Sequence, residues 1–260
     1  MKKVGIILLI AILSLNSCLP VLAAPQPDIR LTLVNPWNTI PADWSVDLVA
    51  IGNGHRVDRA CYDDLMAMLE GCREAGHRPM VKSSYRTQAT QKQLHENKVR
   101  QWIGYGYGEE AARKKAATIV AVPGTSEHQL GWAVDIVDDR YHGLNEKQAT
   151  MPAQIWLMEH CWEYGFILRY PVDKSEVTGI IYEPWHYRWV GRDNAKAIYE
   201  SGLCLEEYLE RATKTQTVRA AIEVQYLELA RRILKVLTGV EQLGTTVDLL
   251  APLPQTVMKP

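Results

Sequence analysis

The stretch "SEHQLGWAVDI", from Ser126 to Ile136, places a histidine, a glycine and an aspartate at the start of a predicted buried strand. Gly131 lets the backbone turn sharply without the steric cost that a side chain would impose. From Trp132 onward the side chains alternate between two faces, so Asp135 points away from the large apolar residues. We therefore expect His128 to fold back over the turn and meet Asp135. The two can form a hydrogen-bonded pair in the core or provide two ligands of a metal ion.

A second stretch, "YEPWHYRWVG" from Tyr182 to Gly191, adds a carboxylate and another histidine. Pro184 favours an extended backbone at Glu183, and His186 begins the strand that follows. Two histidines and one aspartate, with no cysteine, form a ligand set that zinc accepts while one position stays open for water. With a single carboxylate ligand the ion retains positive charge, which acidifies that water. Glu183 is then suited to accept the water's proton.

A third stretch, "SSYRT" from Ser83 to Thr87, follows a predicted strand and contains Arg86. A single arginine is most often a solvated surface residue. Attack of activated water on an amide, however, produces an oxyanion, and a fixed guanidinium is a good partner for that oxyanion or for a substrate carboxylate. Because it accompanies a metal-binding group, Arg86 is a candidate for either role.

The three stretches together, in this order and at these separations, resemble the D-alanyl-D-alanine carboxypeptidases of the VanY type. This family is part of a wider group of zinc peptidases that includes D-Ala-D-Ala dipeptidases, lysostaphin-like enzymes and the hedgehog domain. The resemblance runs from about Leu31 to about Leu209. It implies one zinc ion per chain, with the ligands His128, Asp135 and His186.

The resemblance also implies an activity and roles for the residues around the metal. The expected activity is that of an exported zinc carboxypeptidase, a metallopeptidase that removes a C-terminal D-alanine from the stem peptides of peptidoglycan. Glu183 is expected to be the catalytic base, and Arg86 to contact the substrate or the oxyanion. Four further residues are expected to contact the substrate, namely Ser126, Gln91, Tyr170 and Trp185.

Several other functions stay open at this point, because loops decide the length of the pocket and how a terminal carboxylate is bound. Related cleavage reactions are LD-carboxypeptidase action on a tetrapeptide, hydrolysis of the free D-Ala-D-Ala dipeptide and endopeptidase cleavage of a cross-link. A non-catalytic, zinc-stabilised module that binds cell wall is a further alternative. Glu183 beside His186 argues against it, because a structural zinc ion needs no base. A structural lipoprotein with merely buried His–Asp pairs would bind no zinc.

The order of predicted elements indicates an α+β fold, in which a small, mostly antiparallel central sheet carries the zinc site and helices flank it. Apolar residues at helical spacing and terminal glycines predict helices over residues 58–76, 87–104, 109–120, 151–165 and 191–202. Strands are predicted over residues 79–83, 131–137, 166–171 and 186–191. Residues 24–211 are therefore expected to form the zinc peptidase domain.

The C-terminal residues 212–260 form an extension outside the resemblance. A short helical turn is predicted over residues 204–210, and a separate long amphipathic helix follows it. The apolar stripe of this helix contains Ile222, Tyr226, Leu229, Ile233 and Leu237. The helix can dock on the domain, pair with a second copy of the chain or lie on a membrane surface.

The N-terminal residues 1–23 have the pattern of a secretory signal, with "MKK", the apolar run "VGIILLIAILSL" and the small residues of "VLAA". Cleavage near Ala23, lipidation at Cys18 and retention as a membrane anchor stay open. All three place the folded domain outside the cytoplasmic membrane, either in the cell envelope or secreted. Lipidation, or retention as an anchor, would also attach the protein to the membrane through its N-terminus.

Composition and cysteine spacing exclude other classes. With 47% hydrophobic and 23% charged residues the chain is expected to be globular. Its net charge of −1 gives no basic surplus of the kind that favours nucleic acid. On one predicted helix, Cys61 and Cys72 are about 16 Å apart, which is too far for a disulfide. We expect the cysteines after residue 23 to be buried thiols, or to form one pair at most. Nothing in the sequence sets the oligomeric state.

Overall fold

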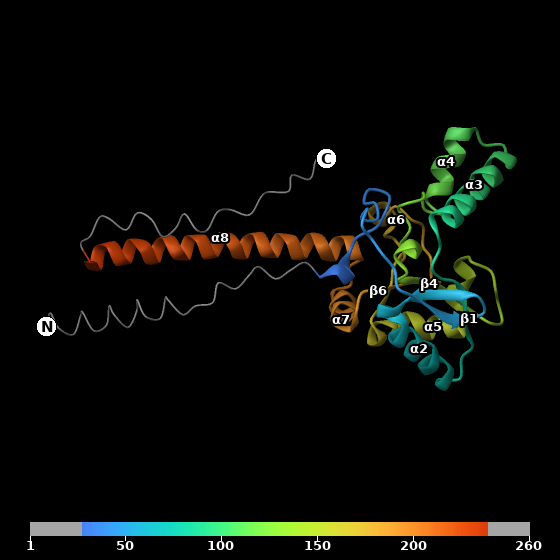
Figure 1. Ribbon diagram of the computed structural model, residues 1–260, viewed down its shortest axis with the longest axis horizontal. Helices are drawn as coiled ribbons and strands as arrows, with labels where there is room; N and C mark the ends of the chain where they lie inside the picture. Colours follow the sequence, from blue (N-terminus) through green and yellow to red (C-terminus); the bar gives the residue numbers. More distant parts are fainter. Residues whose placement is uncertain (1–27, 239–260) are drawn as a thin grey trace. The chain divides into compact units, whose positions relative to one another are not determined.

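A four-stranded antiparallel sheet lies at the centre of the first part of the chain. The computed structural model describes residues 28–238 (Figure 1). The strand order is β3-β4-β6-β5, with β3 at Pro79–Ser83, β4 at Ala133–Asp138, β6 at His186–Trp189 and β5 at Phe166–Leu168. A separate antiparallel hairpin joins β1 at Leu48–Gly52 to β2 at His55–Asp58. This antiparallel sheet with its flanking helices confirms the predicted α+β class.

Most of the helices lie where the sequence predicts them, but α6 (Ser175–Thr178) was not predicted and the last helix differs from the prediction. Residues 28–238 contain seven α-helices. They are α2 (Arg59–Glu74), α3 (Gln88–Gly104), α4 (Glu109–Ala117), α5 (Pro152–His160), α6 (Ser175–Thr178), α7 (Arg192–Ser201) and α8 (Leu205–Thr238). Short 3-10 helices lie at η1 (Ile29–Leu31), η2 (Glu127–Leu130), η3 (Glu146–Thr150) and η4 (Cys161–Tyr164). The helix predicted over residues 151–165 is thus divided into α5 and η4. Gly165 ends η4 in the left-handed conformation that glycine adopts readily.

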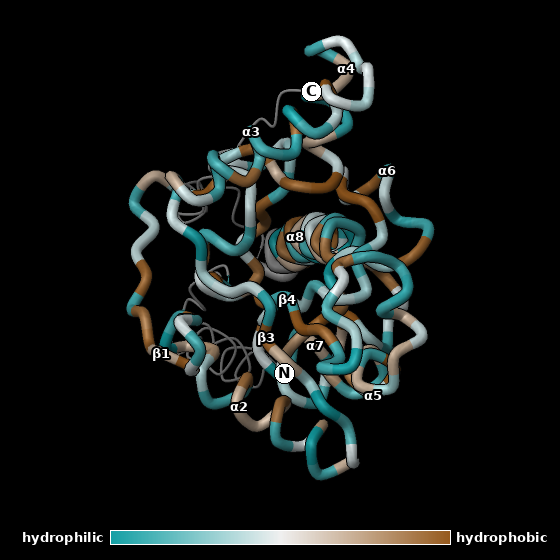
Figure 2. The backbone as a smooth tube through the Cα atoms, turned by 90° about the vertical axis from the view of Figure 1, so that its right-hand side faces the viewer, coloured by the Kyte–Doolittle hydropathy of each residue, from teal (hydrophilic) through white to brown (hydrophobic). Residues whose placement is uncertain are grey.

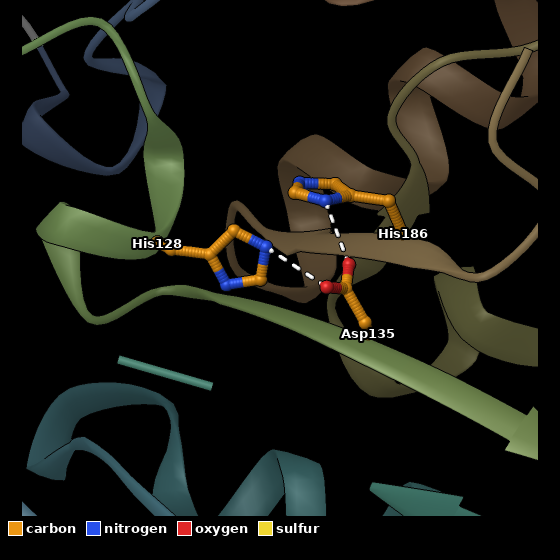
Figure 3. A group of neighbouring side chains, drawn as sticks. All are labelled: His128, Asp135 and His186. Carbon is orange, nitrogen blue, oxygen red and sulfur yellow. Dashed lines mark hydrogen bonds and ion pairs between the residues drawn. The ribbon is translucent and has the colours of Figure 1, made fainter. Parts of the chain in front are cut away.

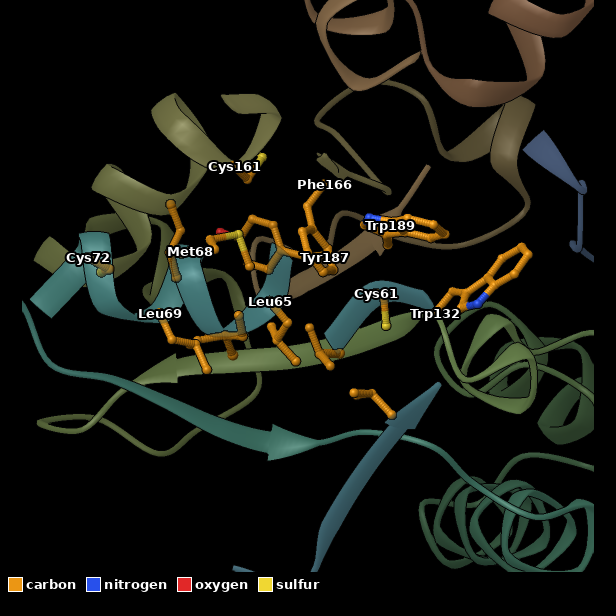
Figure 4. Packing of buried hydrophobic residues seen from close by; sticks show 14 of the residues in the cluster. Cys61, Leu65, Met68, Leu69, Cys72, Trp132, Cys161, Phe166, Tyr187 and Trp189 are labelled. Carbon is orange, nitrogen blue, oxygen red and sulfur yellow. The ribbon is translucent and has the colours of Figure 1, made fainter. Parts of the chain in front are cut away.

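The main hydrophobic core lies between the sheet and α2 and α5 (Figure 4). The side chain of Asp58 caps the first turn of α2 by accepting a hydrogen bond from the backbone N–H of Ala60. Along α2 one face is buried at helical spacing, with Cys61, Leu65, Met68, Leu69 and Cys72. From the sheet, Val134, Ile136, Phe166 and Tyr187 join the same core. The face of β4 that carries Val134 and Ile136 is therefore the core face, which leaves Asp135 on the opposite face.

Helices α3 and α4 form a hairpin with a small core of their own. Val99, Ala112 and Ala116 are buried between the two helices, and Trp102 packs against them. Both helices are drawn mainly in the teal and white of hydrophilic and neutral residues (Figure 2). The first turns of α3 follow directly after the loop that contains Arg86, so this hairpin extends from the edge of the candidate site.

The register of the sheet determines which polar residues meet. Asp135 of β4 is paired with His186 of β6 and with Ser83 of β3. A bulge between Val81 and Ser83 changes the register at the end of β3, just before the loop that leads to Arg86. Residues separated by about fifty positions in sequence are thus brought to one line across the sheet.

The C-terminal region differs from the prediction. A single helix, α8, begins at Leu205 and continues to Thr238, where the sequence suggested a short turn and a separate helix. No glycine or proline interrupts it, so nothing in the chain ends the first turn. Contacts nevertheless divide the chain into one compact unit that ends at Leu209 and a second that begins at Glu210. The predicted boundaries at residues 23 and 211 stay predictions.

In the second unit, the described side chains of the apolar stripe are exposed. They are Ile222, Tyr226, Leu229 and Ile233, whereas the side chain of Leu237 lies outside the described residues. Between residues 28 and 238, none of the helices combines the length and the apolar character needed to cross a bilayer.

Two further expectations concern the N-terminus and the cysteines. The proposed signal in residues 1–23, including Cys18, lies outside the described residues. Cys61, Cys72, Cys161 and Cys204 are free and buried. For these four residues the expectation of buried thiols is confirmed.

Candidate active site

Two histidines and one aspartate meet on the face of the sheet opposite the main core (Figure 3). Nε2 of His128 is 3.2 Å from Oδ2 of Asp135, and Nδ1 of His186 is 3.1 Å from Oδ1 of the same carboxylate. All three side chains are buried, and one ligand atom from each lies within 4.8 Å of the others. The structure thus brings together the three residues that the sequence suggested as metal ligands.

The local fold explains why His128 reaches Asp135. His128 lies in η2, and Gly131 follows it with a φ of +79°. A Cβ atom at Gly131 would lie 3.0 Å from Cβ of Asp58 and 3.2 Å from its backbone nitrogen. Gly131 therefore provides both the left-handed conformation and the close approach that the turn requires. Nδ1 of His128 lies 2.9 Å from the carbonyl oxygen of Ser84. Because this oxygen can only accept, Nδ1 carries the proton and Nε2 is free to face Asp135.

The electrostatics of the group suit a cation. Burial and the charge of Arg86 lower the pKa of His128 to about 4, so its imidazole is neutral and can act as a ligand near pH 7. Burial alone would lower the pKa of His186, but the carboxylate of Asp135, within hydrogen-bond distance of Nδ1, and that of Glu127, 3.6 Å from Nε2, raise it to about 9. This position therefore favours positive charge. A buried N/N/O donor set with this property fits a zinc ion, which accepts histidine and carboxylate ligands.

Glu183 lies in the same cavity as the three candidate ligands. Its Oε2 is 3.7 Å from Nδ1 of His186, and its side chain is almost fully buried. The backbone N–H of Glu183 donates to the carbonyl of Tyr170, and its own carbonyl accepts from the N–H of His186. Burial raises the pKa of Glu183 to about 8, and the charge of Asp135 adds to this, while His186 and Arg86 act in the opposite direction. A carboxyl group that titrates near neutral pH is suited to proton transfer.

Arg86 is fixed by hydrogen bonds on three sides. It donates from Nε to Oγ of Ser83 at 2.9 Å, from Nη1 to Oε1 of Gln91 at 3.3 Å and from Nη2 to Oδ2 of Asp135 at 2.8 Å. A guanidinium has five N–H donors, so donors remain beyond these three bonds. Because Arg86 also lines the cavity, those donors can meet an anionic group in it.

The candidate residues line a cavity of about 470 Å³. Three of the four predicted substrate-contacting residues lie on its wall, namely Ser126, Tyr170 and Trp185. The fourth, Gln91, is fully buried behind Arg86, where its amide also donates to the carbonyl of Ala121 at 2.7 Å. Gln91 thus contacts Arg86 and is not among the residues that line the cavity. One side of the cavity is lined by residues of α3 that the sequence analysis did not name as site residues. They include Leu94, Asn97, Lys98 and Gln101.

One buried acid near the site was missed in the sequence. Glu127, next to His128, is fully buried and accepts hydrogen bonds from Arg169 and Arg188. Its second oxygen, Oε2, is 3.6 Å from Nε2 of His186. A signal was present, because both arginines lie in segments that were predicted to be strands and that also contain large apolar residues. Such arginines require a buried acid as their partner, but the sequence alone does not say which acid it is.

Comparison with known proteins identifies the family. Residues 54–192, a segment that contains all the candidate metal ligands together with Arg86 and Glu183, match the VanY family of D-alanyl-D-alanine carboxypeptidases. The chain belongs to this family. Membership of VanY, which the three sequence stretches suggested, is thereby confirmed.

Individual VanY proteins are similar over the same region. The D-alanyl-D-alanine carboxypeptidase of Enterococcus faecalis is 46% identical over 179 residues, and the match covers 69% of this chain and 65% of that protein. A crystal structure of a VanY D,D-pentapeptidase mutant from a VanB-type vancomycin resistance cassette, in complex with Zn(II), has 46% identity and a TM-score of 0.64, over 69% of this chain and 98% of that one. VanYB in complex with D-alanine-D-alanine has 45% identity and a TM-score of 0.64, over 70% and 97%.

Proposed function

We propose that this VanY-family chain is an exported zinc carboxypeptidase that removes a C-terminal D-alanine from peptidoglycan stem peptides. The observation that carries the proposal is the meeting of a three-ligand group, the buried carboxyl of Glu183 and the fixed guanidinium of Arg86 on one cavity. The Zn(II) complex of one relative and the D-alanine-D-alanine complex of another support the choice of metal and of substrate.

The metal would be held by His128 through Nε2, by His186 through Nδ1 and by the carboxylate of Asp135. A zinc ion bound there would supply a Lewis acid that acidifies water and polarises the carbonyl of the scissile peptide bond. The role of the three residues is to provide two neutral nitrogens and one negative oxygen from rigid positions. Two of them come from adjacent strands, so their relative positions are fixed by the sheet.

Glu183 is the group that moves the proton. Its carboxylate would accept a proton from the water that attacks the peptide carbonyl, and a bond would form between that oxygen and the carbonyl carbon. The same proton would then pass from Glu183 to the nitrogen of D-alanine as the carbon–nitrogen bond breaks. The products are the shortened peptide with a new carboxyl end and free D-alanine. Burial raises the pKa of Glu183, which makes its carboxylate a stronger base than an exposed glutamate.

Arg86 would stabilise the negative charge that develops during this reaction. Three of its N–H groups are engaged by Ser83, Gln91 and Asp135, so its position is set before a substrate arrives. A pre-oriented donor loses little free energy to reorganisation when charge appears on the substrate oxygen. The same guanidinium could bind the terminal carboxylate of the substrate, and the wall residues Ser126, Tyr170 and Trp185 would contact its remaining groups.

Export is part of the proposal because the substrate is a cell-wall component. The signal-like residues 1–23 support it. Fractionation of cells that express the full chain should recover it in the envelope or in the medium. Its recovery in the cytoplasm, in cells that export a control protein normally, would contradict export. The proposed peptidase activity would not be affected by that result.

The activity is tested with a panel of substrates. The full chain, purified in mild detergent and supplied with zinc, would be incubated with a pentapeptide ending in D-Ala-D-Ala, a tetrapeptide ending in L-Lys-D-Ala, the free dipeptide and a cross-linked stem peptide. Mass spectrometry should show release of one alanine from the pentapeptide at the highest rate. Preferred cleavage of another member of the panel would assign that bond instead. Binding of all four without turnover would indicate a non-catalytic wall-binding module.

A further inference from the structure

Glu127 is a buried carboxylate whose orientation is fixed from one side. Its Oε1 accepts a hydrogen bond from Nε of Arg169 at 2.7 Å and from Nη1 of Arg188 at 2.9 Å, and all three side chains are fully buried. Both partners of Oε1 are guanidinium groups, so this oxygen meets two positive charges. Rotation of the carboxylate would break two charge-assisted hydrogen bonds.

The arginines are themselves held by the rest of the domain. Arg169 also binds both oxygens of Glu206, at 2.9 Å and 2.6 Å. Arg188 also donates to the backbone carbonyls of Arg30 and Thr32. The position of Glu127 is therefore set by contacts that do not involve the metal-binding group.

The second oxygen of Glu127 faces an imidazole that has no other partner on that side. Oε2 of Glu127 and Nε2 of His186 are 3.6 Å apart. Within residues 28–238, both are buried side-chain atoms that make no hydrogen bond. The separation exceeds that of a formed hydrogen bond by a few tenths of an ångström. At this separation no water molecule fits between the two atoms. Each is therefore the polar atom available to the other.

We propose that Glu127 is a positioning residue that keeps a proton on Nε2 of His186 and so leaves Nδ1 available to the metal. The inference rests on the zinc site of the proposed function. An ionised carboxylate can only accept hydrogen bonds, so an imidazole nitrogen that faces it is favoured as N–H. The other ring nitrogen, Nδ1, faces Asp135 and Glu183.

At His128 the two ring nitrogens have the opposite roles. There Nδ1 donates to the carbonyl of Ser84, and Nε2 faces Asp135. Each imidazole thus has an acceptor on its outer nitrogen and the aspartate near its inner nitrogen. Outer acceptors of this kind fix the tautomer and the ring orientation of metal-binding histidines. At His186 the acceptor is charged, which makes its preference stronger than that of a carbonyl.

The structure allows a sharp test with Glu127→Gln. The two arginines can only donate, so the amide oxygen must face them and the amide NH₂ group must face Nε2 of His186. Donor would then oppose donor, and the imidazole would be favoured with its proton on Nδ1, where the metal binds. The zinc dissociation constant, measured by competition with a chelator on the full chain, should rise by about 10- to 100-fold.

Glu206→Gln is the matched control. It perturbs the same buried network through Arg169, but Glu206 makes no contact with His186 among its hydrogen bonds and ion pairs. Its zinc dissociation constant should change by less than about threefold, a limit below the range typical of outer partners of metal ligands. Equal losses of zinc affinity in Glu127→Gln and Glu206→Gln would show a purely structural role and overturn the inference.

A second measurement uses the parent chain and does not depend on whether a variant folds. In zinc-loaded protein labelled with ¹⁵N-histidine, the ring nitrogens of His186 should show a protonated Nε2 and an unprotonated Nδ1. A His186 ring with no proton on Nε2 would overturn the inference while leaving the zinc site intact. If the parent chain binds no zinc at all, the proposed function fails and the inference fails with it.

Discussion

Asp135 lies directly opposite His186 in the β4–β6 pair, and Oδ1 of the aspartate is 3.1 Å from Nδ1 of the imidazole. Its other oxygen, Oδ2, is 3.2 Å from Nε2 of His128 and accepts a hydrogen bond from Arg86 at 2.8 Å. A single carboxylate therefore connects both imidazoles and the guanidinium. The sheet register decides this arrangement, because it places Asp135 beside residues from two other segments.

Replacement of Asp135 by Asn should abolish tight zinc binding. The amide keeps the size of the side chain but removes its negative charge and one of its two acceptors. The zinc dissociation constant should rise by more than the roughly 100-fold upper value typical of outer partners. Metal content after gel filtration would measure this. Asp139→Asn, at a partly exposed ion pair with Arg78, is the control and should retain zinc.

Replacement of Glu183 by Gln should remove activity and leave the metal in place. The glutamine cannot accept and return a proton, so kcat should fall by about 10²- to 10⁴-fold. The zinc content should be that of the parent chain, because Glu183 is not one of the three candidate ligands. Glu176→Gln, at an exposed position in α6, should have parent kinetics. Undiminished kcat in Glu183→Gln would remove Glu183 from the mechanism.

Arg86 and Gln91 should differ in how their loss affects the enzyme. Arg86→Lys cannot reproduce the three-sided contact, and kcat/KM should fall by about 10²-fold or more. Gln91→Met keeps the volume but leaves Arg86 without one acceptor, so the free energy of unfolding should fall by about 1–3 kcal/mol. Its effect on kcat/KM should be smaller than that of Arg86→Lys. The opposite order would restore Gln91 as a direct substrate contact.

Replacement of Gly131 by Ala should damage both stability and zinc affinity. The left-handed φ of +79° alone costs a non-glycine residue about 1–2 kcal/mol. The new Cβ would also lie 3.0 Å from Cβ of Asp58, which would displace the turn that carries His128. Gly76→Ala is the matched control, since Gly76 has a φ of +84° but no atom within 4 Å of an added Cβ. Thermal unfolding should show a larger loss at Gly131, and only that variant should bind zinc more weakly.

The stability of the domain should decrease in acid because of Asp138. Hydrogen bonds from the guanidinium of Arg140 and from the backbone N–H groups of Ala153 and Arg140 keep the pKa of Asp138 well below its usual range, although burial opposes this. A carboxyl group whose pKa is lower in the folded state stabilises the fold above its unfolded pKa, about 3.9, and this contribution disappears as pH falls further.

Urea unfolding at several pH values would test the contribution of Asp138. At pH 6, Asp138→Asn should be less stable than the parent chain by about 1–3 kcal/mol, because the amide leaves buried donors unsatisfied. The difference should shrink as pH is lowered below about 4. A difference that is independent of pH would show that the charge of Asp138 does not contribute.

Much of the fold followed from local patterns. The strand at Pro79–Ser83 and the helix at Gln88–Gly104 lie where periodicity, caps and glycines predicted them. The extent of the C-terminal helix did not. One helix runs from Leu205 to Thr238, because no glycine or proline interrupts it, whereas the sequence predicted a short turn and a separate helix.

Residue types and their spacing were enough to predict the candidate site: two histidines, an aspartate, a glutamate and an arginine, all within the segment that matches the VanY family. Residue type sets which atoms can bind a metal or move a proton, and that information is local. The contact of Gln91 with Arg86, and that of Glu127 with the outer nitrogen of His186, became visible only in the folded chain. These are contacts between distant segments, and strand register and burial fix them through the packing of the whole domain.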